Sequence, residues 1–211
     1  MFPSKEDFFN ALAEKHGLER QKKFAAAKVA VCGLGGLGSN IAIALARAGV
    51  GRLHLIDFDR IEITNLNRQQ YFPEQIGLFK ADAMKENLSH IAPYCEITSQ
   101  VAEITYENVE KLLAGFPIVC EAFDKAEAKA ALVDAVMEKL PGSCLVSGSG
   151  MAGFESANLI KTRKITSKFY ICGDMSSDAG SGIGLYPPRV LACAAHQAHA
   201  ILRIIAGEFE C

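Results

Sequence analysis

Short apolar runs alternate with longer amphipathic stretches along most of this 211-residue chain. The stretches between the runs are rich in good helix formers and predict helices, among them 78–91 and 105–114. Strands that alternate with helices indicate a mostly parallel sheet covered on both faces. The apolar runs predict buried strands, which lie at residues 29–32, 50–57, 95–101, 117–124 and 142–150.

The pattern changes after Gly150. Two strands are predicted at 154–161 and 167–172, joined around Thr162-Arg-Lys-Ile-Thr166, as an antiparallel pair at one edge of the sheet. A loop rich in glycine and serine follows over 173–186. This part of the chain therefore predicts an extension of the sheet rather than a second domain.

Helices are predicted at both ends of the chain. Residues 4–27 predict a charged helical arm that Ser4 caps and that breaks near Gly17, and residues 190–205 predict a last helix. The predicted fold class is α/β, with a Rossmann-like, doubly wound, mostly parallel sheet, an antiparallel edge extension and N- and C-terminal helices. We expect residues 1–211 to form a single domain, of which 1–27 is the arm.

Composition predicts a soluble cytoplasmic protein. A net charge of -2 and a pI near 6.2 argue against a general nucleic-acid binder, so no nucleic-acid partner is expected. No apolar run approaches the roughly 20 residues that cross a bilayer, and the first residues lack the apolar segment of a secretory leader. The seven cysteines include no CxxC pair, which predicts reduced thiols and no zinc site.

A glycine-rich stretch, Val29-Ala-Val-Cys-Gly-Leu-Gly-Gly-Leu-Gly-Ser39, joins the first predicted strand to a helix. Glycines allow a tight turn and a close approach to phosphate, and a helix N-terminus favours negative charge. The stretch therefore predicts a nucleotide site, lined by Gly33, Gly35, Gly36 and Gly38. Dehydrogenases and methyltransferases share this motif, so a nicotinamide-dependent oxidoreductase is an alternative, although no proton-transfer pair stands out.

Polar side chains follow the strands next to this stretch. Asp57 and Asp124 each end a predicted strand, where doubly wound sheets present ligands, and the cations Arg68 and Lys80 follow Asp57. Cations that stabilise developing charge and an acid for Mg²⁺ are what phosphate bond chemistry needs. The predicted set is Asp57, Asp59, Asn65, Arg68, Lys80 and Asp124.

Together these motifs resemble the ThiF/MoeB/HesA superfamily, relatives of the ubiquitin-activating enzymes. The resemblance covers about residues 18–206 and is nearest to the shorter branch called thiamine biosynthesis protein ThiF, family 2. The motifs that carry it are Gly33-Leu-Gly-Gly-Leu-Gly-Ser39, Asp57-Phe-Asp59, Asn65-Leu-Asn-Arg-Gln69, Gly77-Leu-Phe-Lys80 and Glu121-Ala-Phe-Asp124.

The resemblance implies an adenylyltransferase that uses ATP and Mg²⁺ and works as a homodimer. The substrate would be the C-terminal glycine carboxylate of a small ubiquitin-like sulfur-carrier protein ending in Gly-Gly, ThiS-like, for thiamine thiazole or related sulfur transfer. The glycines would line the nucleotide and Asp57 would hold the ribose. Asn65, Arg68 and Lys80 would contact phosphates, and Asp124 would hold Mg²⁺, which makes Arg68, Lys80 and Asp124 the catalytic set.

The chain also departs from the superfamily pattern, and these departures leave alternatives open. It lacks the two CxxC pairs of many relatives, so a nucleotide-binding scaffold or regulator without turnover is a second hypothesis. Cys172 is the nearest match to an active cysteine but reads as a buried strand residue, and Arg20 is the best match to an arginine that enters a partner subunit's site. Other sulfur carriers, a peptide C-terminus or a carboxylate on a tRNA base are alternative substrates.

Overall fold

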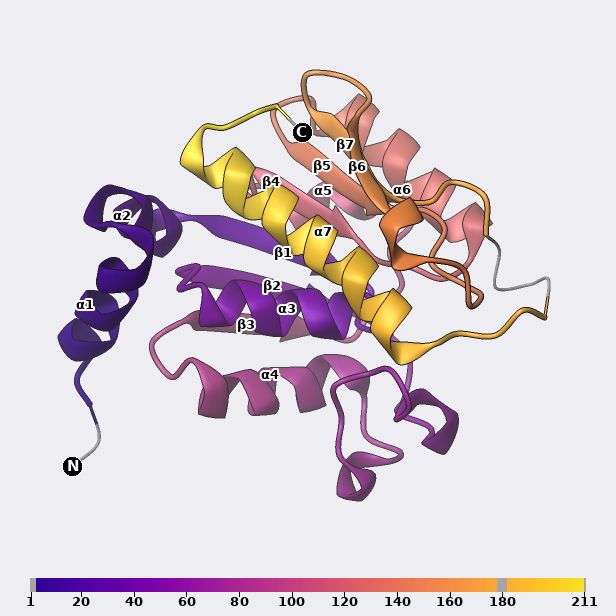
Figure 1. Ribbon diagram of the computed structural model, residues 1–211, viewed down its shortest axis with the longest axis horizontal. Coiled ribbons are helices and arrows are strands. Elements are labelled where there is room, and N and C mark those ends of the chain that lie inside the picture. The colour runs from indigo at the N-terminus through magenta and orange to yellow at the C-terminus, as the bar shows by residue number, and fades with distance from the viewer. Residues whose placement is uncertain (1–2, 178–181, 211) are drawn as a thin grey trace.

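The computed structural model describes residues 3–177 and 182–210 and contains one seven-stranded sheet (Figure 1). Its strand order is β3-β2-β1-β4-β5-β7-β6, and all neighbours are parallel except the edge pair β6 and β7. The strands are β1 (Lys28–Cys32), β2 (Arg52–Ile56), β3 (Glu96–Gln100), β4 (Ile118–Glu121), β5 (Cys144–Gly148), β6 (Lys161–Lys164) and β7 (Phe169–Gly173). The predicted α/β fold with an antiparallel edge is confirmed.

The strand order reverses between β1 and β4, which is where open α/β sheets bind ligands. Cys32, the last residue of β1, lies opposite Ile56 of β2 and Glu121 of β4. The chain segments that follow these three strands therefore begin at the same level. Gly33, Asp57 and Ala122 all lie at this edge of the sheet.

Helices cover both faces of the sheet (Figure 1). Buried apolar side chains of α3, α4 and α7 pack on one face, and those of α5 and α6 pack on the other. Because both faces are covered, β1, β4 and β5 are almost entirely buried instead of alternating between buried and exposed positions. These helices are α3 (Gly38–Arg47), α4 (Lys80–Ile91), α5 (Val109–Leu113), α6 (Ala126–Lys139) and α7 (Pro187–Ala206).

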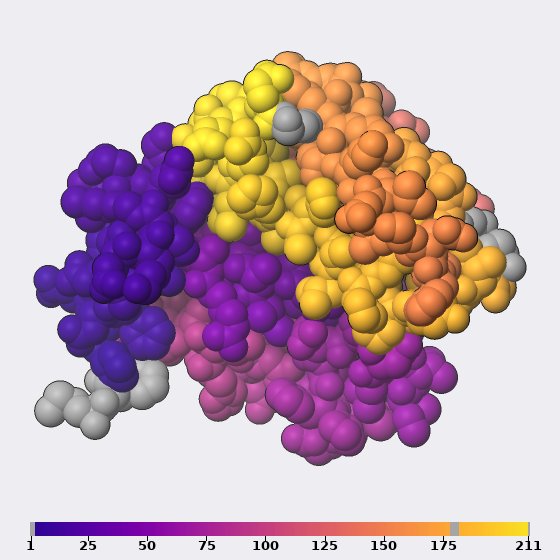
Figure 2. All heavy atoms as spheres, in the orientation of Figure 1, coloured from indigo at the N-terminus to yellow at the C-terminus, as the bar shows by residue number. Residues whose placement is uncertain are grey.

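The N-terminal arm consists of α1 (Lys5–His16) and α2 (Leu18–Ala26), at one side of the molecule (Figure 2). Ser4 and Asp7 form a reciprocal capping box at the start of α1. Gly17 has φ 83°, which ends α1 as predicted, and α2 leads into β1. None of the residues of α1 is buried, and the arm is anchored chiefly through Gln21 and Phe24 of α2.

One strand prediction was wrong. The chain was expected to form a strand over 154–161, but β6 lies at Lys161–Lys164, inside the expected connection. The preceding segment contains only a 3-10 turn, η3 (Ala157–Leu159). The carbonyl oxygens of Ala152, Glu155 and Ser156 accept hydrogen bonds from the Arg189 guanidinium instead of from a neighbouring strand. Within residues 3–177 and 182–210, no helix is both long and apolar enough to cross a membrane.

Candidate nucleotide site

The glycine loop runs from the end of β1 to the first turn of α3. Gly33 has φ 89°, and its amide donates to the Ile56 carbonyl (2.8 Å). A Cβ on Gly33 would lie 2.8 Å from the Ala122 carbonyl oxygen, and one on Gly38 would collide with the Gly33 oxygen. These two glycines are therefore required by the turn itself. Gly35 is half-buried, with only a Gln69 nitrogen (3.7 Å) near a would-be Cβ, so this part of the loop is open to a ligand.

Gly36 is the second half-buried glycine of the loop. A Cβ there would lie 3.0 Å from Cγ1 of Val190 in α7 and 3.4 Å from Cδ of Arg68. The loop is also tied to α3, because Ser39 Oγ donates to the Gly35 carbonyl (2.7 Å) and Asn40 Nδ2 donates to the Gly36 carbonyl (2.7 Å). Gly36 therefore packs against the first turn of α7 as well as facing the site.

Asp57 lies directly beside the glycine loop. Its carboxylate accepts the amide of Leu34 (2.6 Å) through Oδ2 and the amide of Asp59 (2.7 Å) through Oδ1. Burial raises the pKa of Asp57, against the two backbone amides and the charge of Lys80, which lower it. Each carboxylate oxygen can accept more than one hydrogen bond, so both keep capacity for ribose hydroxyls.

Lys80 is the first residue of α4 and is almost fully buried. Its Nζ lies 2.8 Å from Oδ2 of Asp59, whose side chain is half exposed. The two residues were both predicted to contact the nucleotide, and the structure pairs them with each other. A phosphate that reaches Lys80 would therefore share the ammonium group with Asp59.

The polar loop that follows Asp59 is ordered by hydrogen bonds. The side chain of Asn65 accepts the amide of Glu62 (3.1 Å) in the short turn η1 (Ile63–Asn65). The Arg68 guanidinium donates to the carbonyl of Thr64 (3.0 Å) and to the side chain of Asn67 (2.7 Å). The aliphatic part of the Arg68 side chain thus lies against the glycine loop. Its guanidinium is hydrogen-bonded to residues of the polar loop that carries Arg68.

A groove of about 960 Å³ runs beside this loop, between α3, α4 and the start of α7. Arg68 and several amide side chains line it together with apolar residues. Figure 2 views this face, where the purple polar loop lies against the gold first turn of α7. Arg68 therefore lies between the groove and the glycine loop.

Asp124 follows the end of β4, one residue beyond the Ala122–Phe123 pair that touches Gly33. Its carboxylate is exposed and makes no hydrogen bond or ion pair with the residues that the structure describes. Those residues also contain no group of three His, Cys, Asp or Glu that could hold a metal. Mg²⁺ keeps several waters and is typically held by one or two carboxylates plus substrate phosphates, and Asp124 fits that kind of site.

A buried polar cluster, which the sequence did not predict, lies under Asp124. Glu121 is fully buried, and its carboxylate accepts hydrogen bonds from Lys129 Nζ, from the Ser147 hydroxyl and from the amide of Phe123. The acidic residue within an apolar predicted strand was a sequence signal for this cluster, because a buried carboxylate needs hydrogen-bond or charge partners.

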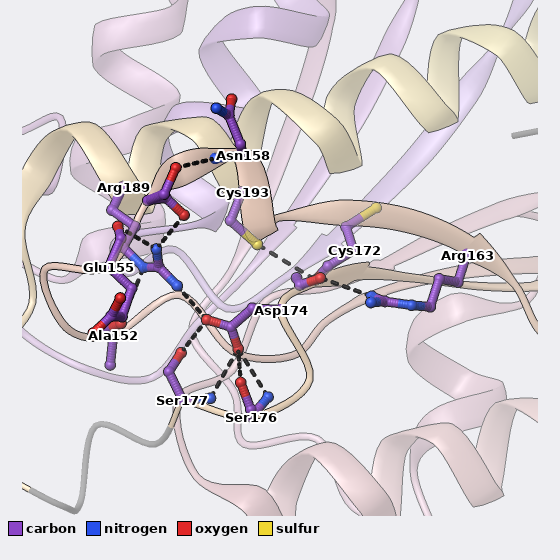
Figure 3. A network of polar contacts seen from close by, with 12 residues as sticks. Ala152, Glu155, Asn158, Arg163, Cys172, Asp174, Ser176, Ser177, Arg189 and Cys193 are labelled. Atoms are coloured by element: carbon purple, nitrogen blue, oxygen red, sulfur yellow. Dashed lines mark hydrogen bonds and ion pairs between the residues drawn. The ribbon is translucent and has the colours of Figure 1, made fainter.

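A second buried ion pair lies beyond the carboxyl ends of β5 and β7. The Arg189 guanidinium, in the first turn of α7, binds Asp174 directly after β7 (Figure 3). Asp174 also accepts the amides of Ser176 and Ser177 (both 2.8 Å) and the Ser177 hydroxyl (2.7 Å). Although burial opposes it, these donors and Arg189 hold the pKa of Asp174 well below its usual range. The pair joins the segments after β5 and β7 to α7.

Two further candidates, Arg20 and Cys172, are engaged in contacts outside the glycine loop. Arg20 is exposed on α2 and pairs with Glu208 (3.1 Å), beyond the C-terminal end of α7. Cys172 is fully buried in β7, and its Sγ lies 3.5 Å from the Thr162 hydroxyl. The structure thus gives Cys172 the packed strand position that the sequence favoured, and it does not bring Arg20 to the site of its own chain. Part of the predicted Gly/Ser loop, residues 178–181, lies outside the described residues.

Comparison with known proteins agrees with this geometry. A model of the ThiF family matches residues 9–210. The chain belongs to the ThiF family. Its fold is similar to that of the solved Escherichia coli tRNA N6-threonylcarbamoyladenosine dehydratase, TcdA, in complex with ATP. That structure has a TM-score of 0.86 and 25% identity, over 99% of this chain and 98% of that chain.

Curated ThiF-family relatives include two kinds of enzyme. The tRNA threonylcarbamoyladenosine dehydratase of Escherichia coli (strain K12) is 39% identical over 127 residues, 59% of this chain and 47% of that protein. The protein of the same name from Bacillus subtilis (strain 168) is 37% identical over 157 residues, 70% of this chain and 59% of that protein. The adenylyltransferase and sulfurtransferase UBA4 of Eremothecium gossypii is 33% identical over 141 residues, 66% of this chain and 31% of that protein. The chain thus spans less than two thirds of the length of each of these relatives.

Proposed function

We propose that this chain binds ATP with Mg²⁺ at the carboxyl ends of β1 and β4 and adenylates a carboxylate. The similar TcdA structure is a complex with ATP, which supports the choice of nucleotide. The observation that carries the proposal is the convergence at one sheet edge of an open glycine loop, the buried cation Lys80 and the exposed carboxylate of Asp124.

The residues present suit attack by a carboxylate on the α-phosphate. A carboxylate is already a nucleophile at neutral pH, so no protein base is required, and catalysis consists of positioning and charge stabilisation. Gly35, Gly36 and the N-terminus of α3 would hold phosphate oxygens, and Asp57 would accept the ribose hydroxyls.

The cations would stabilise the charge that develops on the departing pyrophosphate. Lys80 would share its ammonium group between Asp59 and the phosphates, whereas Arg68 must give up its hydrogen bonds to Thr64 and Asn67. Mg²⁺, held by Asp124, would neutralise phosphate charge when bound. Asn65 would contact the phosphates from the loop that its hydrogen bond with Glu62 orders, and Asp59 would position Lys80.

The carboxylate substrate has two candidates. The first is the C-terminal glycine of a ThiS-like sulfur-carrier protein, which the match to an adenylyltransferase and sulfurtransferase supports. The second is the carboxylate of a threonylcarbamoyl group on tRNA, which the two dehydratase relatives support. Activation by adenylation suits both, because each presents a free carboxylate.

Pyrophosphate exchange into ATP tests the reaction and separates the two substrates. We expect exchange that depends either on a carrier ending in Gly-Gly or on tRNA carrying threonylcarbamoyladenosine. Arg68→Ala and Asp124→Ala should abolish exchange, because they remove a cation and the Mg²⁺ ligand, while circular dichroism shows an intact fold. Retained exchange in both variants would contradict the assignment of the site.

We further propose that the chain works as a homodimer in which Arg20 enters the partner subunit's site. Within one chain Arg20 is exposed and pairs with Glu208, so its guanidinium lies at the surface. A scaffold or regulator without turnover is the remaining alternative. Tight ATP binding with no exchange on either substrate would favour that alternative.

A further inference from the structure

We propose that Lys129 and Ser147, acting through the buried carboxylate of Glu121, position the turn that carries Asp124 and so set how tightly Mg²⁺ is held with ATP. The inference rests on the proposed function, because it concerns the same nucleotide site. It makes Lys129, Ser147 and Glu121 positioning residues, none of which touches the nucleotide.

The cluster holds both backbone groups of Phe123, the residue before Asp124. The Phe123 amide donates to Oε1 of Glu121 (2.7 Å), and its carbonyl accepts Lys129 Nζ (3.2 Å). Lys129 Nζ also contacts both oxygens of the Glu121 carboxylate, at 2.8 and 2.7 Å. The Glu121 carboxylate and the Lys129 ammonium group thus hold the amide and the carbonyl of Phe123, respectively.

Two further contacts fix the start of the same turn. The Glu121 carbonyl accepts Gln197 Nε2 of α7 (2.9 Å), and the Ala122 amide donates to the Cys32 carbonyl (2.8 Å). The turn therefore cannot move without disturbing β1, β4 and α7. Asp124, directly beyond this fixed backbone, is exposed.

The turn also touches the glycine loop directly. A Cβ on Gly33 would meet the Ala122 carbonyl at 2.8 Å and the Phe123 ring at 2.9 Å. The position of Asp124 relative to the phosphates is consequently set by the same contacts that shape the loop. Mg²⁺ demands near-ideal octahedral geometry, so a small displacement of its carboxylate ligand weakens the binding of the metal more than the binding of the nucleotide.

A buried ion pair is a costly way to hold a turn. Glu121 is fully buried and Lys129 is about one-fifth exposed, and burying such charges offsets much of their attraction. A packed apolar pair would stabilise the fold at least as well, but it would not fix the amide and the carbonyl of Phe123. The cluster is therefore better explained by placement of Asp124 than by stability.

The test compares ATP affinity in saturating Mg²⁺ with ATP affinity in excess EDTA, by calorimetry on the full chain. The ratio of the two dissociation constants is the gain due to Mg²⁺. Lys129→Met should lower this gain by about 10- to 100-fold, toward the value of Asp124→Asn, and leave the affinity in EDTA within about twofold. Lys129→Arg, which can span the same groups, should restore the gain.

Lys139→Met is the matched control, because it removes the same charge from the far end of α6 and should keep the wild-type gain. Ser147→Ala gives a second measurement, with a smaller loss of the gain, should Lys129→Met fail to fold. An unchanged gain in Lys129→Met and Ser147→Ala, or equal losses of affinity with and without Mg²⁺, would overturn the inference. Wild-type protein that binds no ATP would instead overturn the proposed function.

Discussion

Gly33 combines a positive φ of 89° with a close approach to β4, which makes it the most constrained position of the glycine loop. Gly33→Ala would place a Cβ 2.8 Å from the Ala122 carbonyl oxygen. We expect it to lower the free energy of unfolding by about 1–3 kcal/mol, the usual cost of a residue held in a sparsely populated conformation. Urea unfolding followed by circular dichroism measures this loss.

Gly35→Ala is the matched control for that experiment. Its Cβ would find its nearest neighbour, a Gln69 nitrogen, at 3.7 Å, so stability should change by less than about 1 kcal/mol. The added methyl group would still stand where a phosphate approaches the loop. Equal destabilisation by both substitutions would contradict the distinction between a glycine that shapes the turn and one that faces the ligand.

Single residues also show the limit of reading this site from sequence. Asp57 and Lys80 were predicted, because an acid after a strand and a lysine opening a helix are visible in the pattern. The buried clusters around Glu121 and Arg189 were not predicted. Ser147 lies 26 residues from Glu121 and Asp174 lies 15 residues from Arg189, and no local period reveals these two contacts.

At the scale of elements, the pair between Arg189 and Asp174 joins α7 to the segments after β5 and β7. The lowered pKa of Asp174 means that the folded chain is stabilised by its ionised form. That contribution is complete above the unfolded pKa, about 3.9, and is lost as the pH falls below it toward the folded pKa.

Asp174→Asn should therefore destabilise the chain most at pH 5 to 7, by about 3–5 kcal/mol, because it leaves a buried guanidinium without its charge partner. The difference in unfolding free energy between wild type and variant should shrink as the pH falls from about 4 toward 2.5. Urea unfolding across this pH range measures it. Exposed Asp134→Asn serves as the control, and a difference that stays constant down to the lowest pH would refute the role of the pair.

The same pair explains why one element was misplaced. Apolar residues near Phe154 suggested a strand, yet three carbonyls of this segment bind Arg189, so β6 begins only at Lys161. By contrast, β1, β2, β4 and β5 were predicted because each contains a short run of apolar residues, most of which are buried. The last helix was predicted over 190–205. In the structure α7 spans Pro187–Ala206 and is capped by Gly207, whose φ is 87°.

At the scale of the whole molecule, nucleotide binding at a sheet edge that joins β1, β2, β4 and α7 should stabilise the complete fold. ATP with Mg²⁺ at about 100 times its dissociation constant contributes about 2.7 kcal/mol. For a domain of this size that is a rise in melting temperature of about 5–10 °C. Differential scanning calorimetry with ATP and with NADH checks this expectation. A larger rise with NADH than with ATP would favour the oxidoreductase alternative.

The two outermost strands of the sheet have a consequence for how this chain meets other copies of itself. β6 has only four residues, three of them Lys or Arg, and β3 carries Glu96, Thr98 and Gln100. Short, charged edge strands discourage the strand-to-strand pairing that leads to fibrils. Like positive charges on β6 also repel a second β6. Self-association by extension of the sheet is thereby discouraged at both of its outermost strands.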